Sequence, residues 1–412
     1  MRRARAAACA VLAAAFALTF ALDPWQGELV SDIPLYRGYA DLFLDGVVPY
    51  RDVDFEYPPL AVPVIALPGI VSLELNAYRL AFAALCLALA AAILLVAGRL
   101  AALSAGSERR ALVAMALAPV ATGAMLRTHF DLAPLLCLAG GLAAVGASRS
   151  RTGFALLGVG GALKLFPLVA APVAAAWLIG RGRRGEALTG LAITAAVVAL
   201  AALSAVALSP QGAWDAVEYH IERPVQVESL PATVLNGIDA MGGRTPDPVN
   251  SHRSDGLEHP AAGALTALFA TLLCAAVAGL TLAARRLPDA RGLALAGFGA
   301  AAAMVSLGKV VSPQFMLWLI PLAALAWAWG MRALAVVTAA AVATTMFWFP
   351  ERYFDLVDRE PLPLAAVALR NALLVAMLAL VARELRRLLR ASGEAARSRP
   401  QAHPGVLRSA PR

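Results

Sequence analysis

The sequence predicts an all-α polytopic membrane protein with about twelve transmembrane helices, within a range of roughly 10 to 13. Two observations predict this class. Of the 412 residues, 60% are hydrophobic and only 15% are charged, whereas about a quarter of the residues in a soluble domain are charged. Apolar runs close to bilayer-spanning length also recur along the whole chain. In lipid, each run can satisfy its backbone polar groups only as a helix.

Each apolar run predicts one transmembrane segment. The first run follows a basic start and lacks a strong small-x-small cleavage site, so it predicts an uncleaved span rather than a signal peptide. The predicted spans lie near residues 6–22, 76–97, 111–126, 132–147, 153–164, 165–180, 187–208, 261–284, 292–307, 313–329, 333–349 and 363–382.

The placement of arginines predicts the topology. With twelve spans, the arginine-rich connections and both termini lie on one side, which the positive-inside rule identifies as the cytoplasm. One bent helix over 153–180 would move an arginine cluster outside. We therefore predict two short crossings or a re-entrant pair there, with Lys164 at the outer turn. The arginines of the connections are Arg99, Arg109, Arg110, Arg149, Arg151, Arg181, Arg183, Arg184, Arg285, Arg286 and Arg291.

Two long connections, 23–75 and 209–260, are predicted to lie outside. Each holds a group of eight acidic residues, up to Glu56 in the first and from Asp215 to Glu258 in the second. The apolar stretch that ends at Leu75 is short and interrupted by proline, so it favours an interfacial helix over a span.

The remaining features limit the number of domains and the classes of function. We expect residues 1–390 to form one transmembrane domain and 391–412 to be a basic, disordered cytoplasmic tail.

The net charge of +8 is explained by topology, so no nucleic-acid partner is predicted. The four cysteines lie in apolar runs as small hydrophobes. The sequence contains no P-loop, no HExxH and no Cys/His metal spacing.

The first outer connection contains a candidate catalytic carboxylate, Asp32, shortly after the first span. It also contains the segment Tyr57-Pro58-Pro59. A carboxylate at the membrane surface can deprotonate a hydroxyl nucleophile within hydrogen-bond distance. The alternative is that the acidic residues only solvate the loop.

The only two lysines, Lys164 and Lys309, are predicted at the outer ends of spans. A lysine within an apolar stretch is energetically costly, and such residues commonly serve function. Two point cations at this level suit a lipid-linked phosphate. The alternative is that both ammonium groups extend to lipid headgroups.

Three further polar segments interrupt the apolar pattern at outer positions. The turn at 127–131 suits a phosphate or a sugar, or is a plain polar turn closed by an Arg–Asp pair. The segment 219–229 suits hydrogen bonds to a sugar, or is a solvated loop. The segment 311–318 contains a Ser-Pro pair, which is an ordinary helix start. It is a candidate binding segment only because Lys309 precedes it. Their candidate binding residues are Arg127, His129, Asp131, His220, Arg223, Gln226, Glu228 and Gln314.

Four segments in this order resemble the polyprenyl-phosphate-dependent glycosyltransferases of the GT-C superfamily, in particular glycosyltransferase family 87 of actinobacteria. The resemblance covers roughly residues 6–385. The segments are Asp32 with Gly46…Pro49-Tyr50…Tyr57-Pro58-Pro59, then Lys164-Leu165-Phe166-Pro167, then His220…Arg223-Pro224…Glu228-Ser229, and finally Ser312-Pro313-Gln314…Trp318…Pro321.

The resemblance implies a GT-C-like hexosyltransferase in the bacterial plasma membrane with an extracytoplasmic active site. The donor would be a sugar, often mannose, on a polyprenyl phosphate, and the acceptor an envelope lipid or glycan. Asp32 matches the general base of an inverting displacement. No cofactor is expected, and the residues require no metal, although a divalent cation bridging phosphate and carboxylates stays open. The substrate-binding residues would be Lys164, Lys309, Arg127, His129, Asp131, His220, Arg223, Gln226, Glu228, Gln314 and Tyr57.

Two alternatives use the same residues differently. A transporter or flippase of lipid-linked or anionic substrates would also place cations and broken helices within the membrane. Such proteins usually have paired halves, and no corresponding broken segments occur in the two halves of this sequence. A non-catalytic membrane scaffold would require neither Lys164 nor the Asp32 loop.

Overall fold

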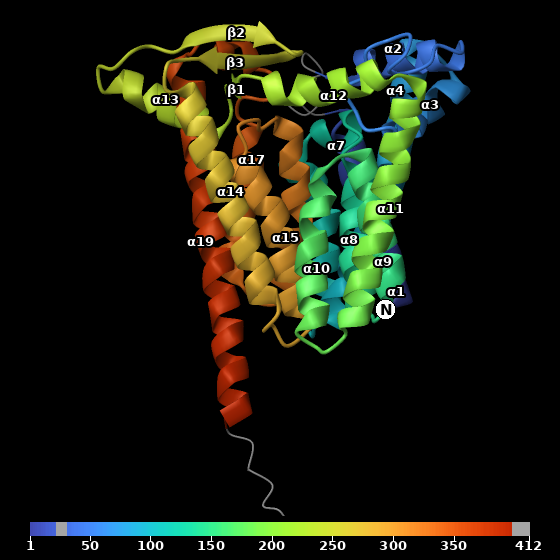
Figure 1. The fold of residues 1–412 in the computed structure, drawn as a ribbon, viewed down its shortest axis with the longest axis vertical. Helices are drawn as coiled ribbons and strands as arrows, with labels where there is room; N and C mark the ends of the chain where they lie inside the picture. The colour runs from blue at the N-terminus through green and yellow to red at the C-terminus, as the bar shows by residue number, and fades with distance from the viewer. Residues whose placement is uncertain (22–30, 398–412) are drawn as a thin grey trace, which may run out of the picture.

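The computed structural model describes residues 1–21 and 31–397. Helices stand side by side in one bundle, and the two long connections cover one end of it (Figure 1). We call these covering segments, residues 31–74 and 209–261, the cap. We call the end of the bundle that they cover the cap end, and the opposite end, where α19 finishes, the tail end.

The elements follow the apolar pattern of the sequence closely. In chain order they are α1 Arg2–Leu18, α2 Ile33–Leu44, α3 Ala61–Val71, α4 Leu75–Leu103, α5 Glu108–Ala116, α6 Ala118–Thr122, α7 Met125–Thr128, α8 Leu132–Gly146, α9 Ser150–Leu163, η1 Phe166–Val169, α10 Ala170–Ile179, α11 Arg184–Leu208, α12 Pro210–Glu222, β1 Val225–Gln226, α13 Leu230–Ala240, β2 Asp247–Ser251, β3 Ser254–Glu258, α14 Ala262–Ala284, α15 Ala290–Leu307, η2 Pro313–Leu319, α16 Ile320–Ala328, α17 Arg332–Thr345, α18 Tyr353–Val357 and α19 Pro361–Arg397.

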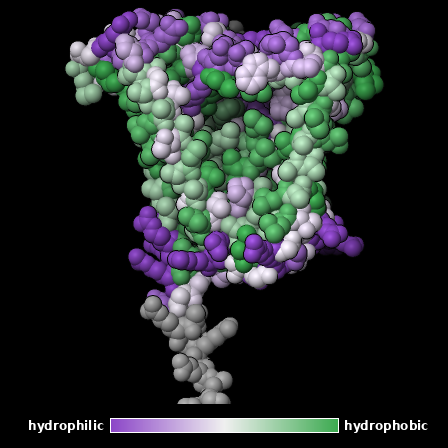
Figure 2. All heavy atoms as spheres, viewed as in Figure 1, coloured by the Kyte–Doolittle hydropathy of each residue, from purple (hydrophilic) through white to green (hydrophobic). Residues whose placement is uncertain are grey.

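Five of the described helices are long and apolar enough to cross a membrane: α4, α11, α14, α15 and α19. Shorter apolar helical segments occupy the other predicted spans, including α8, η1 with α10, η2 with α16, and α17. Figure 2 shows an apolar belt between the polar cap and a polar ring at the tail end. The helical membrane class is confirmed, whereas the number of crossings stays a prediction.

Three helix boundaries need comment. The predicted span 111–126 is divided into α5, α6 and α7, because Gly123 ends α6 with a φ of 50°. The stretch 153–180 is two helical segments rather than one bent helix, because Lys164 has an extended backbone with φ −162° and ψ 133°. Residues 391–397 are helical rather than disordered, because α19 continues to Arg397, and the domain boundary at 391 stays a prediction. The predicted disorder of 398–412 lies outside the described residues.

A small antiparallel sheet in the cap departs from the all-α prediction. Its strand order is β1-β3-β2. Strands β2 and β3 pair from Asp247↔Glu258 to Ser251↔Ser254, so a two-residue turn joins them. Both turn residues, His252 and Arg253, have positive φ, at 53° and 49°. Such turns usually contain Asn-Gly or Asp-Gly, and this sequence lacks that signal.

The two long connections pack on each other at the cap end. Arg253 Nη1 lies 3.1 Å from Glu56 Oε1, and His220 Nε2 lies 2.9 Å from the Glu56 carbonyl oxygen. The start of α12 approaches the first connection so closely that a Cβ on Gly212 would lie 1.8 Å from the Tyr50 carbonyl oxygen. Only glycine fits there, so these contacts set how the second connection lies over the first.

Candidate active site

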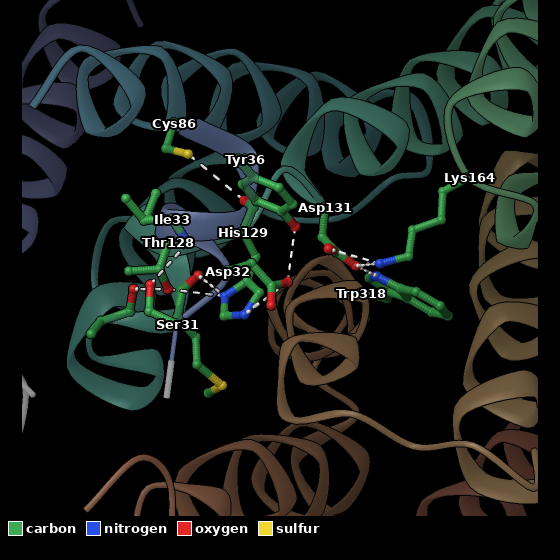
Figure 3. Close-up of polar contacts among 12 residues, drawn as sticks. Ser31, Asp32, Ile33, Tyr36, Cys86, Thr128, His129, Asp131, Lys164 and Trp318 are labelled. Atoms are coloured by element: carbon green, nitrogen blue, oxygen red, sulfur yellow. Dashed lines mark hydrogen bonds and ion pairs between the residues drawn. The ribbon is translucent and has the colours of Figure 1, made fainter. Parts of the chain in front are cut away.

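Polar side chains from four separated segments meet beneath the cap (Figure 3). Asp32 precedes α2, His129 and Asp131 lie in the turn between α7 and α8, Lys164 follows α9, and Trp318 lies in η2. Four of these residues lie in or beside an interruption between helices. The lengths of the apolar runs therefore bring these interruptions, and their polar side chains, to the same end of the bundle.

The Asp131 carboxylate is fully buried and has strong partners. Lys164 Nζ lies 2.8 Å from Oδ1 and 2.9 Å from Oδ2. Trp318 Nε1 donates to Oδ1 at 2.7 Å. A buried carboxylate is tolerated only when it is paired and hydrogen-bonded. These contacts therefore neutralise Asp131 and fix the turn that carries it.

Aromatic rings surround the ammonium group of Lys164. Its Nζ lies 5.3 Å from the ring centroid of Phe130, 5.1 Å from that of Phe315 and 5.7 Å from that of Trp318. These distances suit cation–π attraction. Because a carboxylate and three rings already contact the ammonium group, little of its charge remains for a substrate.

The Asp32 carboxylate is more open, with 31% of its side chain exposed. The Tyr36 hydroxyl donates to Oδ2 at 2.9 Å, and His129 Nε2 lies 3.6 Å from the same oxygen. Among the described residues, Oδ1 accepts no hydrogen bond. One oxygen of Asp32 is thus anchored, and the other is available to accept a proton from a bound hydroxyl.

The surroundings of His129 indicate which ring nitrogen carries hydrogen. Its Nδ1 lies 2.9 Å from Thr128 Oγ1 and 3.3 Å from the Met125 carbonyl oxygen. Thr128 Oγ1 donates its own hydrogen to the Ala124 carbonyl, so both atoms facing Nδ1 act as acceptors. Nδ1 is therefore the donor, and Nε2 faces Asp32. In a neutral imidazole with hydrogen on Nδ1, Nε2 carries a lone pair that faces the negative Asp32 carboxylate. The contact between Asp32 and His129 is therefore favourable only when a proton lies between Nε2 and Oδ2.

Two phenols border Asp32. The Tyr57 ring lies edge-on to the Tyr36 ring, with centroids 6.2 Å apart. Burial raises the pKa of both phenols, and the charge of Asp32 raises it further. Tyr36 therefore stays protonated and can keep donating to Asp32 at any physiological pH.

Lys309 differs from Lys164 in its partners. Its Nζ donates to two backbone carbonyls, that of Ile221 at 2.6 Å and that of Arg223 at 2.7 Å. Burial lowers the pKa of Lys309, and the nearby Arg223 lowers it further. Within the described part of the chain, neither Lys309 nor Arg223 has a carboxylate within ion-pair distance. Their two positive charges are therefore uncompensated.

The end of α12 connects these cations to Asp32. Burial lowers the pKa of His220, and the charges of Arg223 and Lys164 lower it further. Burial raises the pKa of Tyr219, whereas Arg223 opposes this shift and Asp32 adds to it. Tyr219 therefore lies within electrostatic range of both Arg223 and Asp32.

A hollow of about 430 Å³ opens beside Arg223, between the sheet and the start of α14. Two buried nitrogens of lining residues, Arg223 Nε and His259 Nε2, have no hydrogen-bond partner. Unpaired buried donors favour a ligand with acceptor oxygens, whereas the carboxylates of Asp247 and Glu258, which also line the hollow, oppose an anion. Pro224, Val225 and Leu257 give it an apolar wall.

The other expected binding residues have mainly structural contacts. Arg127 is buried, and its Nε and Nη2 donate to Thr19 Oγ1 at 3.1 Å and to the Thr19 carbonyl at 3.0 Å. Glu228 is buried and accepts from Gln226 Nε2 and Trp348 Nε1. Gln314 lies half-buried in η2. None of these side chains has a described bond to Asp32 or Lys309.

One alternative for the turn at 127–131 is wrong. An Arg–Asp pair does not close it, because Asp131 pairs with Lys164 and Arg127 bonds to Thr19. The sequence alone did not indicate Tyr36 or the role of Trp318. Tyr36 lies four residues after Asp32, which places the two side chains on one face of the start of α2. The Trp318 contact with Asp131 joins residues 187 positions apart, so it had no local signal.

The described residues contain no group of three or more His, Cys, Asp or Glu side chains arranged to hold a metal ion. The open Asp32 and the uncompensated cations together suit a reaction that takes a proton at one point and releases an anion at another.

The fold and this site define a helical, multi-pass membrane protein with a charged site beneath a polar cap. Comparison with protein families matches glycosyltransferase family 87 over residues 55–313. This match covers more than half of the chain, so the protein belongs to glycosyltransferase family 87 and is a membrane glycosyltransferase. No curated protein and no solved structure matched significantly. The matched range includes Lys164, Arg223 and Lys309 and begins after Asp32.

Proposed function

We propose that the protein transfers a hexose, with mannose the first candidate, from a polyprenyl-phosphate donor to an envelope lipid or glycan. The reaction would take place on the extracytoplasmic face of the bacterial plasma membrane. The observations that support this proposal are a partly exposed carboxylate, Asp32, and two cations, Lys309 and Arg223, that have no carboxylate partner among the described residues.

Asp32 acts as the general base in this proposal. An acceptor hydroxyl binds at Oδ1 and attacks the anomeric carbon of the donor sugar. The new carbon–oxygen bond forms as the bond between that carbon and the phosphate oxygen breaks. The hydroxyl proton passes to Asp32, and a single displacement of this kind inverts the configuration at the anomeric carbon.

Tyr36 and His129 hold Asp32 in position. Both contact Oδ2, which leaves Oδ1 for the acceptor. Thr128 and the Met125 carbonyl orient the imidazole through Nδ1. His129 can share the proton that Asp32 receives, because its Nε2 faces the carboxylate. His129 is thus a positioning residue that also stabilises the protonated state of the base.

Lys309 and Arg223 stabilise the departing phosphate. The polyprenyl phosphate leaves with the bonding electron pair, so negative charge grows on it in the transition state. Cations that are already in place and lack carboxylate partners are well suited to stabilise this charge. The hollow beside Arg223 provides room, an apolar wall and two unpaired nitrogens. Lys164 instead maintains the structure around the site through Asp131.

Two experiments test this function. Isolated membranes that contain the protein should transfer labelled hexose from hexosyl polyprenyl phosphate and not from a nucleotide sugar. Mass spectrometry of envelope glycolipids and glycans from a deletion strain should show one species that lacks a hexose. Transfer from a nucleotide sugar alone would contradict the proposed donor. Movement of an intact lipid-linked substrate across sealed vesicles, with no transfer, would support the flippase alternative.

A further inference from the structure

A second charged hollow, of about 380 Å³, lies at the tail end of the bundle, remote in the fold from the cap. Four parts of the fold form it: the start of α15, the connection from α16 to α17, the start of α17, and the C-terminal third of α19. Figure 1 shows the end of α19 far from the sheet. Its lining includes Arg291, Arg332, Arg383 and Arg387, together with Trp329 and Leu388.

The hollow is strongly positive. Four arginines and one carboxylate line it, which leaves a formal charge of about +3 when all five side chains are ionised. Arg383 and Arg387 share one oxygen of Glu384, each at 2.9 Å. Arg332, at the exposed start of α17, has no described ion pair. A single acid therefore cannot balance the charge.

Contacts with the protein fix two of the lining side chains. Arg291 donates to the backbone carbonyls of Ser104 and Ala105, both at 3.3 Å. Trp329 Nε1 donates to Ser104 Oγ at 2.8 Å. Because carbonyls are neutral, they orient the Arg291 guanidinium without removing its charge. A ligand that binds here meets positions that are already set, which lowers the entropic cost of binding.

The same hollow has apolar lining at the level of the membrane surface. Trp329, Met331 and Leu388 contribute to its wall. Figure 2 shows that the polar ring at the tail end borders the apolar belt directly. A ligand with both an anionic head and hydrocarbon chains matches this combination, whereas a free anion would use only the arginines. Basic pockets between transmembrane helices are suited to anionic lipid headgroups.

We propose that this hollow binds the headgroup of an anionic phospholipid, with its phosphates on Arg291, Arg332 and Arg387. The acyl chains of this phospholipid lie along the apolar surfaces of α17 and α19. The charge of the hollow favours a headgroup with two phosphates, such as cardiolipin, over one with a single phosphate. This site is separate from the proposed transfer of a hexose and does not depend on it.

The test uses the purified full-length protein after removal of bound lipid. Native mass spectrometry measures binding of cardiolipin, phosphatidylglycerol and phosphatidylethanolamine, with inorganic phosphate as a soluble competitor. The double variant Arg332→Gln/Arg387→Gln should bind cardiolipin roughly tenfold to thirtyfold more weakly. Both side chains are exposed, and Arg383 still pairs with Glu384, so the fold should persist.

The matched control is Arg109→Gln/Arg286→Gln, which removes the same charge from two exposed positions outside the hollow, one at the start of α5 and one in the connection from α14 to α15. The control should bind cardiolipin as the wild type does. An equal loss of binding in the control would overturn the site, because only general electrostatic attraction would remain. Equal binding of phosphatidylethanolamine, or displacement of cardiolipin by millimolar phosphate, would overturn the anionic-lipid assignment. Thermal unfolding without lipid verifies that the variants are folded.

Discussion

The two lysines of this protein occupy similar places in the sequence pattern and have opposite electrostatic surroundings. Lys164 touches a fully buried carboxylate and three aromatic rings. Lys309 touches two neutral carbonyls, and the charge that lowers its pKa is that of another cation, Arg223. The first lysine therefore has its charge balanced by the protein, and the second does not.

This difference separates structural charge from charge available to a substrate. A cation that is already neutralised stabilises a departing phosphate weakly, because that phosphate has to compete with Asp131. An uncompensated cation is costly in the empty protein and becomes favourable when an anion arrives. In the proposed function, Lys164 therefore supports the structure of the site, and Lys309 stabilises the departing phosphate.

The largest effect is expected for Lys164→Met, which leaves the Asp131 charge buried without its cation. Breaking a buried ion pair from one side costs about 3–5 kcal/mol. The variant should therefore unfold at a much lower temperature in detergent than the wild type. The double variant Lys164→Met/Asp131→Leu removes both charges and should recover much of the loss. A single variant as stable as the wild type would show that Asp131 does not depend on Lys164.

The next largest effect is expected for Lys309→Gln, and it should appear in activity rather than in folding. Loss of one preorganised group that stabilises developing charge lowers rates about 10²–10³-fold. Initial rates of hexose transfer from the polyprenyl-phosphate donor measure this change. Lys309→Arg keeps the charge and should restore part of the rate. Normal transfer by Lys309→Gln, with unchanged thermal unfolding, would move the phosphate site elsewhere.

A smaller effect is expected for Trp318→Phe. Phenylalanine keeps an aromatic ring against Phe166 and Phe315, whose centroids lie 3.8 Å and 4.2 Å from that of Trp318. It loses the donor to Asp131, and a hydrogen bond to a charged group contributes about 1.5–3 kcal/mol. Thermal unfolding should show this loss. The exposed Trp327 provides the control, since Trp327→Phe should change stability little.

The smallest effect concerns pH and His220. Burial lowers the pKa of His220 below its ordinary value, so the folded protein favours the neutral ring. The resulting stability is present above the ordinary pKa of about 6.5 and is lost as the pH falls through the lower folded pKa. His220→Gln keeps a donor toward the Glu56 carbonyl and removes this titration. Its unfolding temperature should therefore fall less than that of the wild type between pH 7.5 and pH 5. An identical fall in both proteins would refute this role.

Much of the fold followed from the apolar runs, because helix ends in this chain coincide with charge, proline and glycine. The break at Lys164 is an example, since one bent helix over 153–180 would have placed an arginine cluster outside. The turn at His252-Arg253 could not be predicted from the apolar runs. Its strands are short and polar, and its turn residues adopt positive φ without the usual glycine or asparagine.

The site was only partly predictable. Asp32, His129, Asp131 and Lys164 are polar interruptions of apolar runs, so the sequence singled them out. Their pairing could not be predicted from the sequence, because packing between helices distant in the sequence, rather than sequence spacing, brings Asp131 to Lys164. Arg127 is the opposite case: it interrupts an apolar run just as strongly, yet its guanidinium bonds to Thr19 at the end of α1.

The central claim is that Asp32 removes the acceptor proton. The direct measurement is hexose transfer by purified Asp32→Asn protein in vesicles, together with binding of the labelled polyprenyl-phosphate donor. We expect transfer to fall about 10²–10⁴-fold, the range of general-base contributions, while donor binding persists. Asp45→Asn, an exposed change at the other end of α2, should transfer normally. Transfer at the wild-type rate by Asp32→Asn would contradict the account.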